Sequence, residues 1–220
     1  MTRGFSGISN YSSLVFDCDG VILNSNRIKT NAFYETTKQF GNKYASALVD
    51  YHVLNGGVSR YVKFNYFITK ILNRKLDPIL YEELLYRFAN EVKKGLNDCE
   101  VAIGLKELSL LTSKANWLIV SGGEQSELRE TFAAKNLEQY FLGGIFGSPS
   151  TKDIIIKREK ERKNINKPAI FIGDSKYDYQ VAKKNDLDFL FLSDWSELPD
   201  WRQWIKEKNI CEVPSIKDIL

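Results

Sequence analysis

A short apolar run that ends in two aspartates places the strongest constraint on this chain. Leu14, Val15 and Phe16 have the character of a buried strand, and Asp17 and Asp19 follow it directly. A carboxylate at the end of a buried strand is unfavourable unless a cation or a shared proton compensates its charge. The sequence therefore predicts that this strand end belongs to a site that binds a cation or transfers a proton.

The overall composition is that of an ordinary globular protein. The 220 residues are enough for one core, or for one core with a small second lobe. A net charge of +3 is too small to indicate nucleic acid or an anionic membrane, so we expect neither as a partner. The three cysteines are far apart and lack metal-site spacing, which predicts a reduced, cytoplasmic protein. We expect residues 1 to 10 to form a loosely held tail.

Residues 27 to 95 have the periodicity of helices throughout. Apolar residues recur there at helical spacing, between residue types that start and stop helices. The pattern predicts a first helix capped by Asn24 or Ser25 and ended by Gly41, a second over 43–54, a third from Ser59, and a fourth from Asp77 to a stop at Gly95.

From about residue 100 onward, predicted helices alternate with short apolar strands. The expected strands are 117–121, 144–148, 169–173 and 189–193, and the expected helices between them are 104–113, 124–137, 151–163 and one that ends near 185. Such alternation predicts an α/β fold with a Rossmann-like parallel sheet and helices on both faces. The strand before Asp17 belongs to the same sheet. Residues 11–26 and 96–220 are therefore expected to form the core, and residues 27–95 an inserted, all-helical cap domain.

Polar side chains gather where the predicted strands end. They are Asp17 and Asp19, Ser121 with Gly122, Lys152, and Asp174 with Asp178. Loops at the carboxyl ends of parallel strands converge, so we expect these residues to meet. Carboxylates without His or Cys favour a hard cation such as Mg²⁺, and the lysine, hydroxyl and backbone amides suit a phosphate. This inventory points to phosphoryl transfer, in which a carboxylate can be the nucleophile.

Four motifs in order resemble the haloacid dehalogenase superfamily, in its branch with a helical cap that includes phosphoglycolate phosphatase and β-phosphoglucomutase. The motifs are FDCDGVILNS, IVSGG, SPSTK and GDSKYD, and the resemblance extends from Leu14 to about Leu192. Each motif falls at a predicted strand end, as the family requires.

The resemblance implies a role for each motif residue. Asp17 would attack phosphorus, and Asp19 would protonate the leaving group and then activate water. Mg²⁺ would be held by Asp17, Asp174 and the backbone carbonyl of Asp19, with Asp178 supporting the metal site. Ser121, Gly122 and Lys152 would bind the phosphate.

A segment of the predicted cap, NGGVSR at 55 to 60, resembles the substrate-specificity loop of the same relatives. The resemblance implies that Ser59 and Arg60 bind substrate, while a solvated position in a first helical turn is the alternative for Arg60. His52, the single histidine, is interpreted as a surface or packing residue, and Cys18 as part of the core.

Three functions remain open at this stage. The first is a Mg²⁺-dependent phosphatase that acts on a small phosphorylated metabolite such as a sugar phosphate, as a monomer or weak homodimer. The second is a phosphomutase similar to β-phosphoglucomutase. The third is a non-catalytic binding protein on the same fold, which the intact set of Asp17, Asp19, Lys152 and Asp174 argues against.

Overall fold

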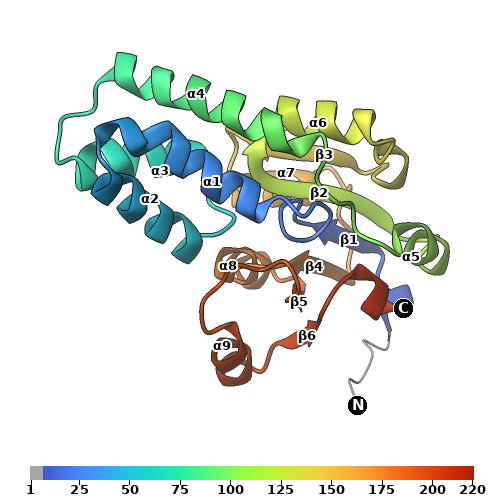
Figure 1. Ribbon diagram of the computed structural model, residues 1–220. Helices are drawn as coiled ribbons and strands as arrows, with labels where there is room; N and C mark the ends of the chain where they lie inside the picture. Colours follow the sequence, from blue (N-terminus) through green and yellow to red (C-terminus); the bar gives the residue numbers. More distant parts are fainter. Residues whose placement is uncertain (1–6) are drawn as a thin grey trace.

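The computed structural model describes residues 7–220 as a six-stranded parallel sheet covered by helices, with a helical lobe at one side (Figure 1). The strand order is β3-β2-β1-β4-β5-β6, which confirms the predicted α/β fold. The strands are β1 (Ser13–Phe16), β2 (Asn116–Glu124), β3 (Gly144–Ser148), β4 (Ala169–Gly173), β5 (Asp188–Leu192) and β6 (Cys211–Val213).

Strand β1 lies in the middle of the sheet and is buried on both faces. Alternate side chains of a strand point to opposite faces, so Leu14 and Phe16 enter one hydrophobic core while Val15 enters the other. Helices α5 (Leu105–Leu111) and α6 (Gln125–Ala134) cover the first face, and α7 (Lys152–Glu161) and α8 (Lys176–Lys184) cover the second. Parallel pairing of β1 with both β2 and β4 brings three carboxyl ends to one edge.

The helical lobe consists of α1 to α4. The segment between β1 and α5 holds only helices among its regular elements, as the periodicity predicts. They are α1 (Asn26–Thr37), the 3₁₀ turn η2 (Lys38–Phe40), α2 (Asn42–Leu54), α3 (Arg60–Tyr66) with its π-helical extension η3 (Phe67–Ile71), and α4 (Pro78–Leu96). They enclose a third core, in which the rings of Phe33, Phe64 and Phe88 pack together. None of the helices within residues 7–220 is both long and apolar enough to cross a membrane.

Gly95 does not stop the fourth helix, contrary to the prediction. Helix α4 continues to Leu96, and Gly95 lies where α4 crosses α1. A Cβ atom at Gly95 would lie 2.7 Å from Cγ2 of Ile28. The glycine is therefore required for the close approach of two helices rather than for a helix end.

Both ends of the described chain are more ordered than the sequence indicates. Ile8 is buried in a 3₁₀ turn, η1 (Ile8–Asn10), so the expected loose tail does not include these residues; its residues 1–6 lie outside the described part. Strand β6 was not predicted, because three residues are too short to show a pattern. Between β5 and β6, helix α9 (Trp201–Lys208) packs the rings of Trp201 and Trp204 on Phe191.

The close approach of Gly95 to Ile28 predicts that alanine at position 95 destabilises the protein, although the same substitution usually stabilises a helix. Gly→Ala in a helix interior normally stabilises by about 1 kcal/mol. We expect Gly95→Ala to lower the free energy of unfolding instead by about 1 kcal/mol net, since the added methyl overpacks the crossing. Urea denaturation of Gly95→Ala, in the wild-type and the Ile28→Ala backgrounds, measures this change in the free energy of unfolding. Asn90→Ala, on the exposed face of α4, is the control and should stabilise slightly. Stabilisation by Gly95→Ala in both backgrounds would contradict the packing role.

Candidate active site

A buried cluster of opposite charges lies at the carboxyl end of β1. Asp17 is 2% exposed, and its Oδ1 accepts a hydrogen bond of 2.7 Å from the Cys18 amide. Lys152, the first residue of α7, extends its Nζ to within 2.8 Å of Asp17 Oδ2 and 2.6 Å of Asp178 Oδ1. One ammonium thus holds two carboxylates that lie 161 residues apart in the chain.

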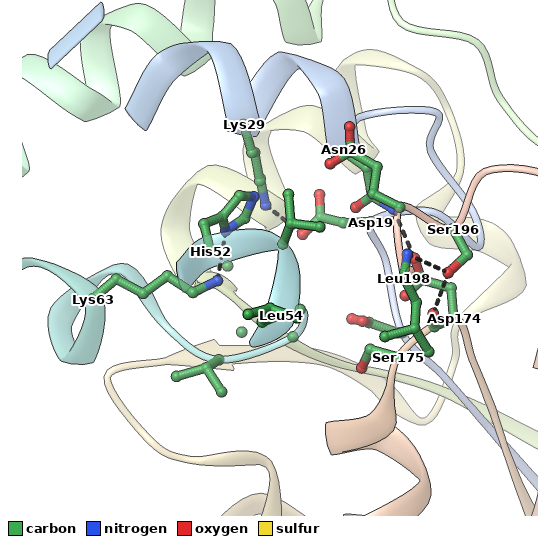
Figure 2. A pocket seen from close by; sticks show the side chains of 18 of the residues that line it. Asp19, Asn26, Lys29, His52, Leu54, Lys63, Asp174, Ser175, Ser196 and Leu198 are labelled. Atoms are coloured by element: carbon green, nitrogen blue, oxygen red, sulfur yellow. Dashed lines mark hydrogen bonds and ion pairs between the residues drawn. The ribbon is translucent and has the colours of Figure 1, made fainter. Parts of the chain in front are cut away.

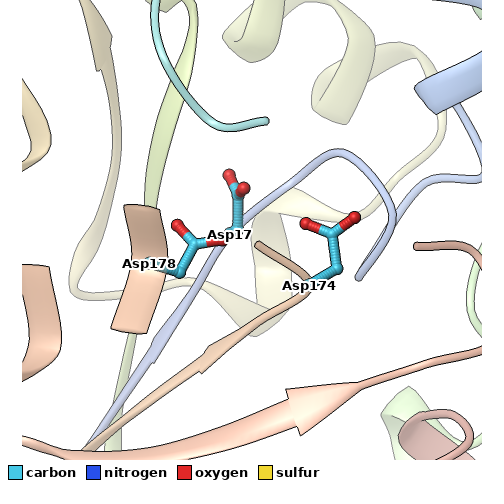
Figure 3. A group of neighbouring side chains, drawn as sticks. All are labelled: Asp17, Asp174 and Asp178. Atoms are coloured by element: carbon cyan, nitrogen blue, oxygen red, sulfur yellow. The ribbon is translucent and has the colours of Figure 1, made fainter. Parts of the chain in front are cut away.

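The three aspartates that follow β1 and β4 lie together (Figure 3). Asp17, Asp174 and Asp178 each place a carboxylate oxygen within 4.8 Å of the others. Both oxygens of Asp178 are engaged, one by Lys152 and the other by the Ser175 hydroxyl at 2.6 Å. Asp174 accepts a 2.7 Å hydrogen bond from Asn26 on one oxygen, and no residue within 7–220 bonds to its other oxygen. Both oxygens of Asp17 are engaged as well, so Asp174 is the one member of this group with a carboxylate oxygen that no described residue contacts by a hydrogen bond. Together the three carboxylates could hold a metal ion.

The electrostatics of this cluster fit a divalent cation. Burial, with the nearby Asp178 and Asp19 carboxylates, raises the pKa of Asp17 to about 7 even though Lys152 opposes the shift. Burial and the same repulsion from Asp178 and Asp17 raise the pKa of Asp174 well above its ordinary value. Carboxylate oxygens without soft ligands match Mg²⁺, whose charge would relieve this repulsion.

Asp19 has different partners from Asp17, and they lie in the helical lobe. Its carboxylate pairs with Lys29 on α1 and accepts a 2.6 Å hydrogen bond from the Ser25 hydroxyl. Burial alone would raise the pKa of Asp19, but the Lys29 ammonium and these hydrogen bonds hold it below its usual range. Ser25 is the N-cap residue of α1, but its side chain accepts no capping hydrogen bond from the helix. Its hydroxyl points instead to Asp19 and to the Leu23 carbonyl.

The predicted phosphate-binding turn is an irregular part of β2. Ser121 is fully buried, and its hydroxyl oxygen accepts a 3.0 Å hydrogen bond from the Gly123 amide. The register of β2 against β3 shifts between Val120 and Glu124, which frees this stretch from regular pairing. A Cβ atom at Gly122 would lie 2.2 Å from the carbonyl oxygen of Gly57, so a side chain here would push the helical lobe off the core.

The two residues predicted from the specificity-loop resemblance occupy different environments. The Arg60 guanidinium forms two hydrogen bonds with Glu127 on α6, of 2.7 and 2.5 Å, and lies 4.7 Å from the centre of the Phe88 ring. Arg60 is buried and also lines the cavity between lobe and core. Ser59 is the N-cap residue of α3 and is not among the described residues that line this cavity.

The cavity between the helical lobe and the strand ends brings together residues that sequence reasoning missed (Figure 2). Its empty volume is about 700 Å³, which includes open solvent at the mouth. Lys29, Lys63 and His52 line it from the lobe, opposite Asp174 and Ser175 (Figure 2). Lys63 Nζ lies 2.7 Å from His52 Nδ1.

Some of these residues had a detectable signal in the sequence. Lys63 follows Arg60 by three residues and so shares its helix face, which makes Lys63 a candidate wherever Arg60 is one. His52 packs against Phe33, with ring centroids 4.6 Å apart, so the interpretation as a packing residue is correct, but the histidine also contacts Lys63 at the cavity. No pattern in the sequence indicates that Lys29 reaches Asp19.

Comparison with known proteins places this arrangement in a family. The family model described as haloacid dehalogenase-like hydrolase matches residues 14–192. No functionally curated protein matches the chain.

Solved structures share the fold at low sequence identity. One is a predicted phosphatase from Clostridium acetobutylicum, 20% identical, with a TM-score of 0.73 over 95% of this chain and 96% of that one. Another is a predicted phosphoglycolate phosphatase from Haemophilus somnus, 15% identical, with a TM-score of 0.73 over 97% and 98% of the two chains. A hydrolase from Pseudomonas syringae is 14% identical, with a TM-score of 0.73 over 94% and 95%.

The raised pKa of Asp17 predicts how the metal-free protein responds to pH. The folded protein keeps the Asp17 proton up to about pH 7, whereas an unfolded chain releases an aspartate proton at about pH 3.9. Stability from this group is therefore full at low pH and is lost as the pH rises between these two values. Urea denaturation in chelator should show a decline of about 1 kcal/mol per pH unit over this window.

Asp17→Asn is the matched variant for this measurement, because the amide keeps the shape and does not titrate. Its free energy of unfolding should decline less steeply than that of the wild type across the same window. Parallel pH profiles for the two proteins would contradict the assignment of the raised pKa to Asp17.

Proposed function

The chain belongs to the haloacid dehalogenase-like hydrolase family, and from this membership and its site we propose that it is a Mg²⁺-dependent phosphatase of small phosphorylated metabolites. One observation supports the proposal above all others. Asp17, at the end of the central strand, is buried in contact with Lys152 and beside Asp174. The proposed nucleophile therefore lies next to the proposed phosphate-binding cation, Lys152, and the proposed metal ligand, Asp174.

Asp17 is the proposed nucleophile. One of its carboxylate oxygens attacks phosphorus, the ester bond between phosphorus and the leaving oxygen breaks, and an aspartyl phosphate forms. Lys152 keeps the carboxylate oriented and offsets the negative charge on the phosphoryl oxygens, while Ser121 donates its hydroxyl hydrogen to one of them. Asp17, Asp174 and the Asp19 carbonyl would hold Mg²⁺, which would supply further charge neutralisation at the phosphoryl group.

Asp19 is the proposed acid and base. As the acid it gives a proton to the leaving oxygen, and as the base it takes a proton from the water that attacks the aspartyl phosphate and releases inorganic phosphate. The Lys29 ion pair keeps Asp19 ionised in this structure, which is the form needed for the second step. As the acid in the first step, Asp19 has to carry a proton.

The helical segment 27–95 is the proposed cap domain. Three of its contacts with the core are made to β2 and α6: Gly57 meets Gly122, Arg60 pairs with Glu127, and the Tyr61 hydroxyl donates a 2.6 Å hydrogen bond to Glu124. A lobe docked in this way excludes water from the aspartyl phosphate and presents its own residues to the leaving group.

A panel of phosphorylated metabolites tests the proposal, with 4-nitrophenyl phosphate as a generic ester. Each compound is incubated with Mg²⁺ or with excess chelator, and free phosphate is measured. We expect release from 4-nitrophenyl phosphate and from at least one metabolite with Mg²⁺ alone. Full release in chelator would contradict the metal requirement, and transfer of phosphate within a sugar phosphate without release would indicate a phosphomutase.

Substitutions of Asp17 and Asp19, the two aspartates of the first motif, should impair different steps of turnover. Asp17→Asn should abolish turnover, because an amide is a very poor nucleophile, while circular dichroism shows a retained fold. Asp19→Asn should still form the aspartyl phosphate from an ester with a good leaving group, but hydrolyse it about 100-fold more slowly or worse. Rapid-quench kinetics with 4-nitrophenyl phosphate separates the burst from the steady state. A steady-state rate equal to the wild type in either variant would refute this division of roles.

A second comparison decides whether Arg60 contacts substrate or holds the cap. Both terminal nitrogens of Arg60 bond to Glu127, so we expect Arg60→Met and Glu127→Gln to reduce kcat/KM on the preferred metabolite by the same factor. The double variant should be no worse than either single variant. A much larger loss in Arg60→Met than in Glu127→Gln would instead place Arg60 on the substrate, as the specificity-loop resemblance implies.

A further inference from the structure

Lys63 is a buried lysine at the cavity whose charge has no carboxylate partner. It lies on α3 and is 2% exposed. Its Nζ contacts the neutral ring of His52 at 2.7 Å and lies 5.5 Å from the centre of the Phe33 ring, and no Asp or Glu within residues 7–220 forms an ion pair with it. A fully buried lysine is rare unless something pairs with it. Burial, reinforced by the nearby Lys29 ammonium, lowers the pKa of Lys63 to about 7.

The other cations on this wall of the cavity are already neutralised. Lys29 pairs with Asp19, and Arg60 pairs with Glu127. On the core side, Lys176 lines the cavity together with carboxylates, which belong to Asp17, Asp19, Asp174 and Glu197. Within the described chain, Lys63 is therefore the cavity-lining cation of the helical lobe that is left without a carboxylate.

His52 fixes the position of the Lys63 ammonium. The histidine is nearly buried between α1 and α3, with its ring against Phe33. Burial and the adjacent Lys63 lower the pKa of His52 well below its ordinary value, so its Nδ1 is free to accept a hydrogen bond from the ammonium. No residue within 7–220 accepts a hydrogen bond from the other two N–H groups of Lys63, and Figure 2 shows the lysine on the wall opposite Asp174 and Ser175.

We propose that Lys63, positioned by His52, binds a carboxylate that the substrate carries at a distance from its phosphate ester, so that the substrate is a phosphorylated sugar acid or hydroxy acid. This inference rests on the proposed phosphatase function and names its substrate class. A carboxylate has a single negative charge, which matches the single unpaired ammonium. A second phosphate would bring about two negative charges at neutral pH, and one would remain uncompensated beside the Asp19 carboxylate.

Two matched pairs of phosphate esters test the carboxylate at two chain lengths. The pairs are 3-phosphoglycerate with glycerol 3-phosphate, and 6-phosphogluconate with sorbitol 6-phosphate. Within each pair the compounds differ only by a carboxylate in place of a hydroxymethyl group. Glucose 1,6-bisphosphate against glucose 6-phosphate tests a second phosphate. For each pair, kcat/KM is measured with Mg²⁺, and the dissociation constant is measured by calorimetry without Mg²⁺.

We expect wild-type protein to prefer the carboxylate member of at least one pair by about tenfold or more, in kcat/KM and in affinity. Lys63→Met should remove this preference, and Lys93→Met, which removes an exposed lysine of α4, should retain it. His52→Leu should also reduce the preference, whereas His52→Gln should keep part of it, because the amide oxygen can accept from the ammonium. Thermal denaturation of each variant verifies that the fold is retained.

Equal kcat/KM and equal affinity for both members of each pair would overturn the inference. A stronger preference for the bisphosphate, or an unchanged preference for the carboxylate in Lys63→Met, would overturn it as well. Failure of the proposed function gives a different result, since 4-nitrophenyl phosphate would then not be hydrolysed at all. In that case the dissociation constants still decide whether Lys63 binds a carboxylate.

Discussion

The Lys152 ammonium, buried between Asp17 and Asp178, is the interaction on which the rest of the site depends. Removing three charged groups from water is unfavourable, and a buried ion pair seldom adds to stability compared with apolar residues of the same volume. The arrangement does fix the Asp17 carboxylate, the proposed nucleophile, at the end of the central strand. With Asp174 beside it, the cluster holds more negative than positive charge, and that imbalance favours a divalent cation.

The helical lobe adds a second layer of charges to the same site. Lys29 binds Asp19, Arg60 binds Glu127 on α6, and the loop at Gly57 rests on Gly122. Each contact joins the lobe to a residue that borders the strand ends, so the docking of the lobe and the state of the site are coupled. Lys63 differs from the other two cations because its neighbour is a neutral histidine, and this is the physical basis for assigning it to an anion on the substrate.

The core of the site could be predicted from the sequence because its signals are local. An apolar run followed by an aspartate marks a strand end, and parallel topology then brings Asp17, Ser121, Lys152 and Asp174 to one edge. The ion pair of Lys29 with Asp19 could not be predicted, because it depends on the angle at which α1 leaves the core. Gly95 was misinterpreted for a similar reason: a glycine near a helix end looks like a stop, and only the crossing of α1 and α4 shows that Ile28 occupies the space of its side chain. The placement of His52 beside Lys63 likewise requires α2 and α3 to be packed together.

Trapping of the aspartyl phosphate tests the central claim most directly. Asp19→Asn protein is mixed with 4-nitrophenyl phosphate and Mg²⁺, quenched in acid and treated with borohydride, which reduces an acyl phosphate to the alcohol. Peptide mass spectrometry should then show that residue 17 has become homoserine, and the same treatment of the variant without substrate should leave Asp17 unchanged. An unmodified Asp17 in protein that has released a stoichiometric burst of 4-nitrophenol would contradict the proposed nucleophile.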